Sequence, residues 1–459
     1  MAFISVIILS ILLNLIINET NDTKRHLVND LFDGVYDKEI YSGYLETDIE
    51  GTELFYVFTP SQSSPEKDPI LLWLNGGPGC SSTYGLLEEI GPVIFLPYQK
   101  QPVLNEYAWN KNANVFFIES PGGVGFSKIA NESFYYNDSI QAVSLNIAIQ
   151  NFFKIFFEYQ NHNFFITGES YAGTYIPYLV KEMFNYMDNN PEAIQLKLKG
   201  FLIGNPYSFE DVDFEDSMIE FSLSHALISM ETYEKYLTEC PHWPQVENIY
   251  PFYNESKDYK YDPIVIDYLL PWKNVTKACN EARNESKQSL EGINFYGILK
   301  TCPLKDNITE LKEGFENIDY EESNMHSEQN HFKKMLMKLQ KEKYYKNLGN
   351  NFKFLNNQSS DNDTDNKTEY EFAIDFFPEC YDNKYTPNFL NNETIKEKLG
   401  VNKSIIHTGC TDLNYKMGDS INFYKNDIKE LSKKKNFSSW LFSGTEDVAC
   451  NTWYIKIPK

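Results

Sequence analysis

The stretch that decides the fold is "FFITGESYAGTYIPYLV" at residues 164–180. An apolar run is followed by a turn in which Gly168 and Ala172 flank Ser170, and a helical pattern follows the turn. A serine at such a strand-to-helix turn is held in a strained backbone conformation that requires small neighbours. The turn exposes the serine hydroxyl and places backbone N–H groups of the helix start beside it. The pattern therefore predicts a nucleophilic serine, although a single motif of this kind also arises by chance.

The same combination of a short apolar run and a polar turn recurs along the chain. Such runs lie at residues 70–75, 114–120, 162–170, 197–205 and 436–447, and two segments that alternate like strands lie at 42–47 and 51–60. Because each run is apolar throughout, it suits a strand that is buried on both faces of a sheet. A helical pattern at residues 175–187 separates two of the runs. The alternation predicts an α/β fold with a mostly parallel central sheet and helices on both faces.

A second informative stretch is "WLNGGPGCSS" at residues 73–82, which follows one of the predicted strands. Its glycines and its proline predict a loop whose backbone approaches a neighbouring segment closely. A glycine N–H group in such a loop is a candidate second donor to an oxyanion, beside the N–H groups that follow Ser170. The two stretches therefore lie where one hydrolytic fold would need both of them.

The composition limits the partners and the compartment. The 459-residue chain has a net charge of −24, which argues against nucleic acid and anionic membranes as partners. The apolar segment that opens the chain predicts a signal peptide over residues 1–22, because it is short for a membrane span. Seven cysteines and many N-x-S/T sequons suit the secretory pathway. The sequence contains no CxxC or CxxH pair, so a zinc site is not expected. We expect a secreted, lysosomal or vacuolar protein with no membrane anchor after signal cleavage.

Five segments together resemble the serine carboxypeptidases, which are α/β-hydrolases of vacuoles and lysosomes. The segments are "WLNGGPGCSSTYGLLEEIGP", "NVFFIESPGGVGFS", "ITGESYAGTYIP", "LKGFLIGNP" and "SHALIS", and the resemblance runs from about residue 40 to residue 450. It implies an α/β-hydrolase fold with a helical cap insertion. It also implies a serine-type carboxypeptidase that removes C-terminal residues from peptides and proteins at acidic pH, without a cofactor.

The resemblance assigns roles to individual residues. Ser170 is implied to be the nucleophile, and Asp447 is implied to orient the general base. The backbone N–H groups of Gly77 and Tyr171 are implied to form the oxyanion hole. The residues implied to bind the substrate carboxylate are Asn75, Gly76 and Glu169, with Glu89 behind Glu169 and Trp73 lining the pocket.

The chemistry of the implied carboxylate site depends on a proton. Glu169 can donate a hydrogen bond to a carboxylate only while its own carboxyl group is protonated. Two carboxyl groups that are close together and partly desolvated raise the pKa of at least one of them. An arginine is not expected to bind the substrate carboxylate in place of Glu169. Arg25 and Arg283 are the only arginines of the sequence, and neither lies in a matching segment. Substrate binding is therefore predicted to weaken as the pH rises through the raised pKa.

The resemblance also bears on the cysteines. Cys450 matches a cysteine that lines the substrate pocket in part of the family, and Cys80 is implied to pair with Cys380. Spacing leaves the pairing among Cys240, Cys279 and Cys302 open.

The expected domain organisation places an insertion inside the hydrolase core. The predicted parts are a signal peptide at 1–22, the first part of the core at 23–206, a cap insertion at 207–375 with a flexible polar loop at 325–370, and the second part of the core at 376–459. The second part is expected to lack the final strand and helix of the fold. Whether the protein forms a homodimer is left open.

All seven histidines precede Asp447, whereas α/β-hydrolases carry the catalytic histidine after the acid. Three interpretations stay open at this point. The sequence is cut short, the protein is a non-catalytic secreted relative, or the enzyme works with a substitute base. An acyltransferase on the same scaffold is a further alternative, since the same serine chemistry serves acyl transfer.

Overall fold

The computed structural model describes the following residues: 26–96, 101–131, 133–208, 217–240, 276–290, 293–294, 296–299, 385–418, 420, 423–427, 430–431, 433, 436–447 and 450. The chain divides into two units, Met1–Lys300 with Asp382–Lys459 and Thr301–Tyr381, and every described residue belongs to the first. The predicted signal peptide and the predicted loop at 325–370 lie outside these residues. Within the described part, no helix combines the length and the apolar character needed to cross a membrane.

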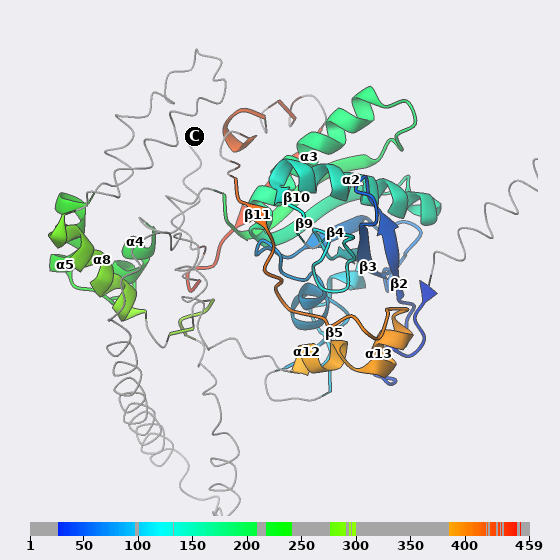
Figure 1. Ribbon diagram of the computed structural model, residues 1–459, viewed down its shortest axis with the longest axis horizontal. Helices are drawn as coiled ribbons and strands as arrows, with labels where there is room; N and C mark the ends of the chain where they lie inside the picture. Colours follow the sequence, from blue (N-terminus) through cyan, green and yellow to red (C-terminus); the bar gives the residue numbers. More distant parts are fainter. Residues whose placement is uncertain are drawn as a thin grey trace, which may run out of the picture. The chain divides into compact units, whose positions relative to one another are not determined.

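An eight-stranded mixed sheet forms the centre of the first unit (Figure 1). Its strands, in spatial order, are β1 (His26–Leu27), β2 (Tyr41–Glu46), β3 (Glu53–Thr59), β7 (Asn114–Ile118), β4 (Ile70–Leu74), β9 (Asn163–Ser170), β10 (Lys197–Pro206) and β12 (Ser438–Phe442). The pairings from β7 through β12 are parallel, and those from β1 through β7 are antiparallel. Each of the seven apolar or alternating segments predicted as a strand forms one, which confirms the predicted α/β fold.

Helices α2 (Asp138–Ile155) and α3 (Ala172–Asn189) cover one face of the sheet (Figure 1). Side chains of β3 alternate between the two faces, and Tyr56 and Phe58 point to this one. Both rings pack edge-on against Phe152 of α2, at centroid distances of 5.6 and 5.4 Å. Phe116 of β7 stacks on the same ring at 4.1 Å. Aromatic packing therefore anchors α2 on the antiparallel part of the sheet.

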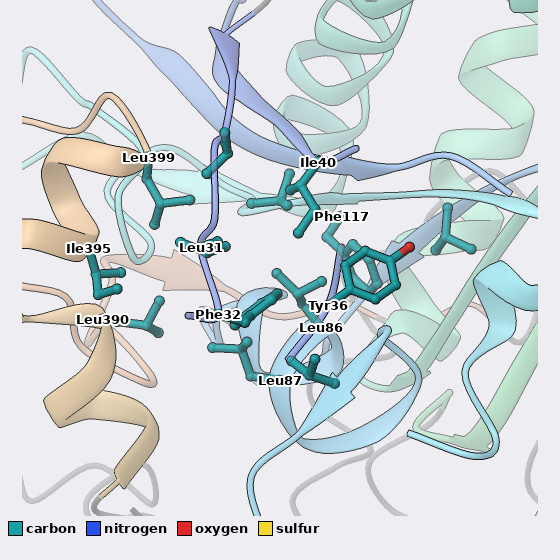
Figure 2. Packing of buried hydrophobic residues seen from close by; sticks show 14 of the residues in the cluster. Leu31, Phe32, Tyr36, Ile40, Leu86, Leu87, Phe117, Leu390, Ile395 and Leu399 are labelled. Carbon is teal, nitrogen blue, oxygen red and sulfur yellow. The ribbon is translucent and has the colours of Figure 1, made fainter. Parts of the chain in front are cut away.

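The opposite face is covered by a second apolar cluster (Figure 2). The alternate residues of β3, Phe55 and Val57, belong to it, as does Phe117 of β7. The other elements around it are the segment 28–40, the π-helix η1 (Gly85–Glu89) and the helices α12 (Tyr385–Leu390) and α13 (Glu393–Lys398). The sheet is therefore buried on both faces from β3 to β10, as the apolar runs predict. For β12 this prediction is wrong, because the strand is mostly exposed, with Trp440 at 49% and Phe442 at 55%.

Three further helices pack together around a small core of their own. They are α4 (Ser217–Ser224), α5 (Met230–Glu239) and α8 (Lys277–Ser289), and they lie in the predicted cap insertion. The core includes Ile219 and Tyr236 and a disulfide between Cys240 and Cys279, which resolves the pairing that spacing left open. The bounds of the cap at 207–375 stay a prediction.

The remaining short elements connect the larger ones. They are β5 (Val93–Ile94), β6 (Val103–Leu104), η2 (Trp109–Lys111), β8 (Tyr136–Asn137), η3 (Phe157–Tyr159), β11 (Tyr415–Lys416) and η7 (Phe423–Asp427).

Candidate active site

The predicted strand-to-helix turn is present at Ser170. Ser170 ends β9 with a φ of 55°, a left-handed conformation that is strained for a residue with a side chain. A Cβ atom at Gly168 would lie 2.8 Å from the Cβ of Ala172 and 2.4 Å from the carbonyl oxygen of Leu74. The tight packing explains why only small residues fit on either side of the serine.

A glycine-rich loop, residues 75–83, packs directly against this turn. A Cβ atom at Gly76 would lie 2.5 Å from the backbone nitrogen of Tyr171 and 2.7 Å from the Cβ of Ser170. Gly77 follows with a φ of 114°, which side chains rarely allow. The loop and the amide of Tyr171 are thus brought to the serine, as an oxyanion hole requires. The roles of Gly77 and Tyr171 as donors stay predictions.

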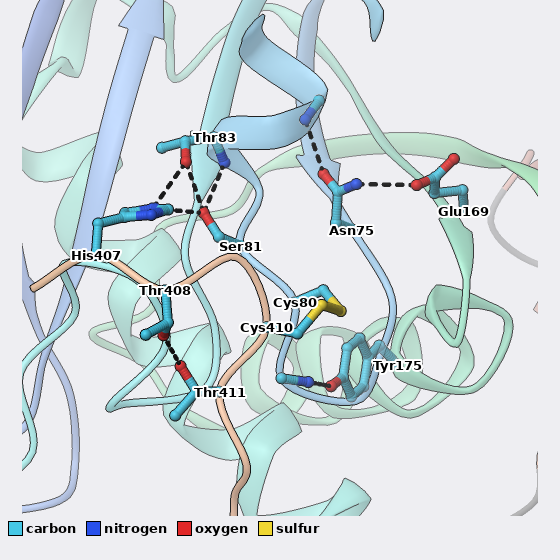
Figure 3. The surroundings of a disulfide bond; sticks show 12 residues. Asn75, Cys80, Ser81, Thr83, Glu169, Tyr175, His407, Thr408, Cys410 and Thr411 are labelled. Atoms are coloured by element: carbon cyan, nitrogen blue, oxygen red, sulfur yellow. Dashed lines mark hydrogen bonds between the residues drawn. A yellow bond between two sulfur atoms is a disulfide. The ribbon is translucent and has the colours of Figure 1, made fainter. Parts of the chain in front are cut away.

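The side chain of Asn75 joins two glutamates beside Ser170. Its Nδ2 donates to Oε1 of Glu89 at 3.0 Å and to Oε1 of Glu169 at 2.9 Å. Its Oδ1 accepts from Trp73 Nε1 at 2.7 Å and from the Gly85 amide at 3.1 Å. Figure 3 shows the amide of Asn75 directed at Glu169. Four hydrogen bonds therefore fix its orientation.

The two glutamates hold protons more tightly than an isolated carboxyl group does. Burial, followed by the charge of Glu169, raises the pKa of Glu89 well above its usual range. Burial also raises the pKa of Glu169, with a further contribution from the charge of Asp447. Each glutamate is partly buried, and no cation of the described residues contributes to either change in pKa. The pair can therefore keep a proton with which to bind an anionic group.

Asp447 follows β12 and belongs to the same neighbourhood, because its charge acts on Glu169. Its Oδ2 accepts a hydrogen bond from Asn205 Nδ2 at 2.7 Å, and its Oδ1 accepts one from the Cys450 amide at 3.3 Å. Asn205 Nδ2 also donates to the carbonyl oxygen of Cys450 at 2.9 Å. Cys450 is buried and takes part in neither disulfide of the described residues. Asp447 and Cys450 are thus placed by Asn205, at the end of β10.

The four histidines of the described residues make their hydrogen bonds elsewhere. His26, His162 and His225 contact the backbone carbonyl oxygens of Lys398, Asp68 and Phe221 respectively. His407 lies in a buried cluster with Ser81, Thr83 and Glu119. None of these bonds joins a histidine to Ser170 or Asp447.

The predicted disulfide between Cys80 and Cys380 is wrong, because Cys80 pairs with Cys410 (Figure 3). The segment after α13 returns alongside the glycine-rich loop, where the Ser81 amide donates to the Gly409 carbonyl at 2.8 Å and the Thr411 amide donates to the Gly79 carbonyl at 2.9 Å. These two bonds place the cysteines opposite each other. Cys380 lies outside the described residues.

The cluster around Glu119 was not predicted. Glu119 and His407 are both buried, and His407 Nε2 lies 3.1 Å from Oε1 of Glu119 and 3.1 Å from the hydroxyl oxygens of Ser81 and Thr83. Glu119 also accepts from the Ser81 hydroxyl and from the Phe126 amide, the latter at 2.5 Å. The signal that could have indicated it is Glu119 itself, an acid at the end of an apolar strand.

Comparisons with known proteins agree with this geometry. The family model described as serine carboxypeptidase matches residues 31–455. Serine carboxypeptidase-like 34 of Arabidopsis thaliana is 36% identical over 275 residues, which cover 58% of this chain and 49% of that protein. Serine carboxypeptidase-like 26 of Oryza sativa subsp. japonica is 40% identical over 206 residues, which cover 44% of this chain and 42% of that protein. The chain thus spans less than half the length of these curated relatives.

A solved structure shares the fold. The prohormone-processing carboxypeptidase Kex1(delta)p of Saccharomyces cerevisiae matches with a TM-score of 0.57 and 19% identity, covering 94% of this chain and 80% of that one. At this identity the likeness shows the fold alone. The family model covers most of the chain, and the protein therefore belongs to the serine carboxypeptidase family.

Proposed function

We propose that this protein recognises the free C-terminus of a peptide and hydrolyses the last peptide bond with Ser170 as the nucleophile. The observation that carries the proposal is the pair of glutamates held by Asn75, of which Glu169 directly precedes Ser170. A site that binds the terminal carboxylate next to the nucleophile selects the last bond of the chain. The same placement gives an endopeptidase no advantage.

In the proposed reaction, Ser170 Oγ loses its proton and attacks the carbonyl carbon of the last peptide bond. The C–N bond then breaks, the C-terminal amino acid leaves with a proton on its nitrogen, and the shortened peptide stays on Ser170 as an ester. Water hydrolyses this acyl-enzyme, which releases the shortened peptide and restores the serine hydroxyl. The N–H groups of Gly77 and Tyr171 stabilise the oxyanion. Asp447 orients the general base, which the described histidines do not supply. The proposal therefore assigns no residue as the general base.

The terminal carboxylate is bound by the Gly76 amide, by the protonated form of Glu169 and by Asn75, whose Nδ2 exchanges one of its two glutamate bonds for the ligand. Glu89 supports Glu169, while Trp73 holds Asn75 through its indole N–H group. Because the proton is needed, the proposal places the activity at acidic pH. This agrees with a secretory, lysosomal or vacuolar location and with a signal peptide at 1–22, both of which we also propose.

A second candidate function is carboxylate binding without catalysis. It is favoured by the histidines, because each described one has partners away from Ser170. Under this proposal the Asn75 site binds peptide C-termini and Ser170 stays unacylated. An acyltransferase on the same scaffold would instead release acyl groups from an activated ester.

The test uses the full chain with a blocked dipeptide that has a free C-terminus and with its C-terminal amide. We expect hydrolysis of the free acid, slower hydrolysis of the amide, and loss of both in Ser170→Ala, by several orders of magnitude. Labelling by a fluorophosphonate should disappear in the same variant, whereas the surface variant Glu66→Gln should match the wild type.

The outcomes separate the candidates. Binding of the free acid in calorimetry without hydrolysis or labelling would support the non-catalytic function. Acyl transfer from a glucose ester without dipeptide hydrolysis would support the acyltransferase. Equal binding of acid and amide would contradict every proposal that uses the Asn75 site.

A further inference from the structure

The side chain of Tyr171 extends away from the predicted active site into the protein interior. It is 1% exposed, and its hydroxyl contacts both carboxylate oxygens of Asp138, at 3.1 Å to Oδ1 and 3.3 Å to Oδ2. Asp138 is the first residue of α2 and is 3% exposed. The residue whose amide faces the proposed oxyanion is thus tied, through its side chain, to a buried acid on another helix.

We infer that Asp138 is a positioning residue that holds the Tyr171 amide in place for catalysis. This inference rests on the proposed function, because it gives the Tyr171 amide the role of oxyanion donor. Asp138 would act only through Tyr171, without touching the substrate.

Asp138, Tyr171, Tyr415 and Gly418 are linked by hydrogen bonds. Oδ1 of Asp138 also accepts a hydrogen bond from the Tyr415 hydroxyl at 2.9 Å. The Gly418 amide donates to the Tyr171 hydroxyl at 3.1 Å. A Cβ atom at Gly418 would lie 2.7 Å from Oδ2 of Asp138, so a side chain there would press on the carboxylate. Three segments that are distant in sequence therefore meet at one acid.

The same group of tyrosines reaches the glycine-rich loop. The ring of Tyr171 packs edge-on against Tyr175 at 5.0 Å, and the Tyr175 hydroxyl accepts a hydrogen bond from the Gly79 amide at 3.2 Å. Figure 3 shows this contact between Tyr175 and the loop. Both parts of the proposed oxyanion hole, the loop of Gly77 and the amide of Tyr171, are thereby attached to one buried network.

Burying the carboxyl group of Asp138 costs free energy of folding, so an apolar side chain would suit this position better if it had only to fill space. A buried carboxyl group is destabilising unless it is hydrogen-bonded, and no ion pair with Asp138 is found within the described residues. Burial raises the pKa of Asp138, while the Tyr415 and Tyr171 hydroxyls act in the opposite direction. What the acid supplies is directional acceptors for hydroxyl groups, and these set the orientation of a side chain.

The experiment combines kinetics and hydrogen exchange in the full chain. Asp138→Ala and Tyr171→Phe each remove the contact, and we expect each to lower kcat by about tenfold to a hundredfold with little change in KM. The double variant should be no worse than either single one, because both remove the same interaction. Asp138→Asn keeps an acceptor and should recover part of the loss. The control Asp427→Asn, which removes an ion pair to Lys181 on the exposed surface of α3, should behave as the wild type.

Hydrogen exchange keeps the test independent of the proposed function. Amides of residues 168–176 should exchange faster in Asp138→Ala and Tyr171→Phe, and so should the Gly418 amide, whose acceptor is the Tyr171 hydroxyl. Segments outside this network should exchange as before. If the wild type has no hydrolytic activity, the proposed function fails and this exchange result alone decides the inference. Unchanged exchange at the turn, exchange that rises equally throughout the chain, or a loss confined to KM would each overturn it.

Discussion

Two hydrogen-bonded clusters that contain buried or partly buried acids lie at the two ends of the glycine-rich loop, and they differ in what surrounds the carboxyl groups. At the start of the loop, Asn75 joins Glu89 and Glu169, two acids that are partly open to solvent. At its end, Glu119 is fully enclosed with His407, at 1% and 0% side-chain exposure. In the first cluster, two carboxyl groups share the side-chain amide of Asn75 as donor. In the second, the single carboxyl group of Glu119 is surrounded by hydroxyl, backbone N–H and imidazole groups.

The difference fits the roles that we propose for the two clusters, the first in binding a carboxylate and the second in holding the loop in place. Burial raises the pKa of both acids in the first cluster, and the charge of Glu169 raises that of Glu89 further, so this cluster can keep a proton. The second cluster satisfies its carboxylate internally with hydroxyl, backbone N–H and imidazole groups. The disulfide from Cys80 to Cys410 joins the same two segments. The loop is thus fixed at one end by the disulfide and the Glu119 cluster, and we propose that its other end binds the substrate carboxylate.

The largest expected effect comes from breaking the enclosed cluster. Glu119→Ala removes the acceptor for His407, for two hydroxyl groups and for the Phe126 amide. We expect the free energy of unfolding to fall by about 3–5 kcal/mol, because removing one partner leaves the others buried without theirs. Urea unfolding of the wild type and the variant measures this loss. An unchanged midpoint would mean that the cluster does not fasten the loop, and Glu66→Gln on the surface is the control.

The strands and the strand-to-helix turn at Ser170 could be predicted from the sequence because their signals are local. A continuous apolar run specifies a strand that is buried on both faces, and small residues beside Ser170 specify the turn. Helix α2 was missed because its buried positions include Gln141, Ser144 and Asn146, so that the helix has no clear polar face.

The enclosed cluster could not be predicted for a different reason. Glu119 and His407 are 288 residues apart in sequence, and Cys80 and Cys410 are 330 apart. Both contacts depend on the segment after α13 lying beside the glycine-rich loop. The hydrophobic periodicity of the sequence carries no information on that placement. The family resemblance directed Cys80 to Cys380, and only the backbone pairing beside Gly79 and Gly409 shows the actual partner.

An intermediate effect is expected from the open cluster, and it depends on pH. Burial raises the pKa of Glu169, so the group stays protonated where an ordinary glutamate is ionised. We therefore expect the proposed binding to persist up to this pKa and to be lost above it. KM for a free-acid dipeptide should rise by about tenfold for each pH unit beyond that point. In Glu169→Gln an amide donates at every pH, so the KM profile should become flat. A variant that keeps the wild-type profile would show that another group supplies the proton.

The smallest effect concerns a single hydroxyl group of the enclosed cluster. Thr83 Oγ1 lies 2.6 Å from the Ser81 hydroxyl, 3.2 Å from Glu119 and 3.1 Å from His407 Nε2. Thr83→Val keeps the shape and removes these bonds, so we expect a loss of about 1 kcal/mol in the free energy of unfolding. The matched control is Thr408→Val, which removes a 2.9 Å bond to the Thr411 hydroxyl on the surface (Figure 3). Equal losses in the two variants would contradict the distinction between an enclosed and an exposed hydroxyl, whereas a loss confined to Thr83→Val would support the cluster as the fastening of the loop.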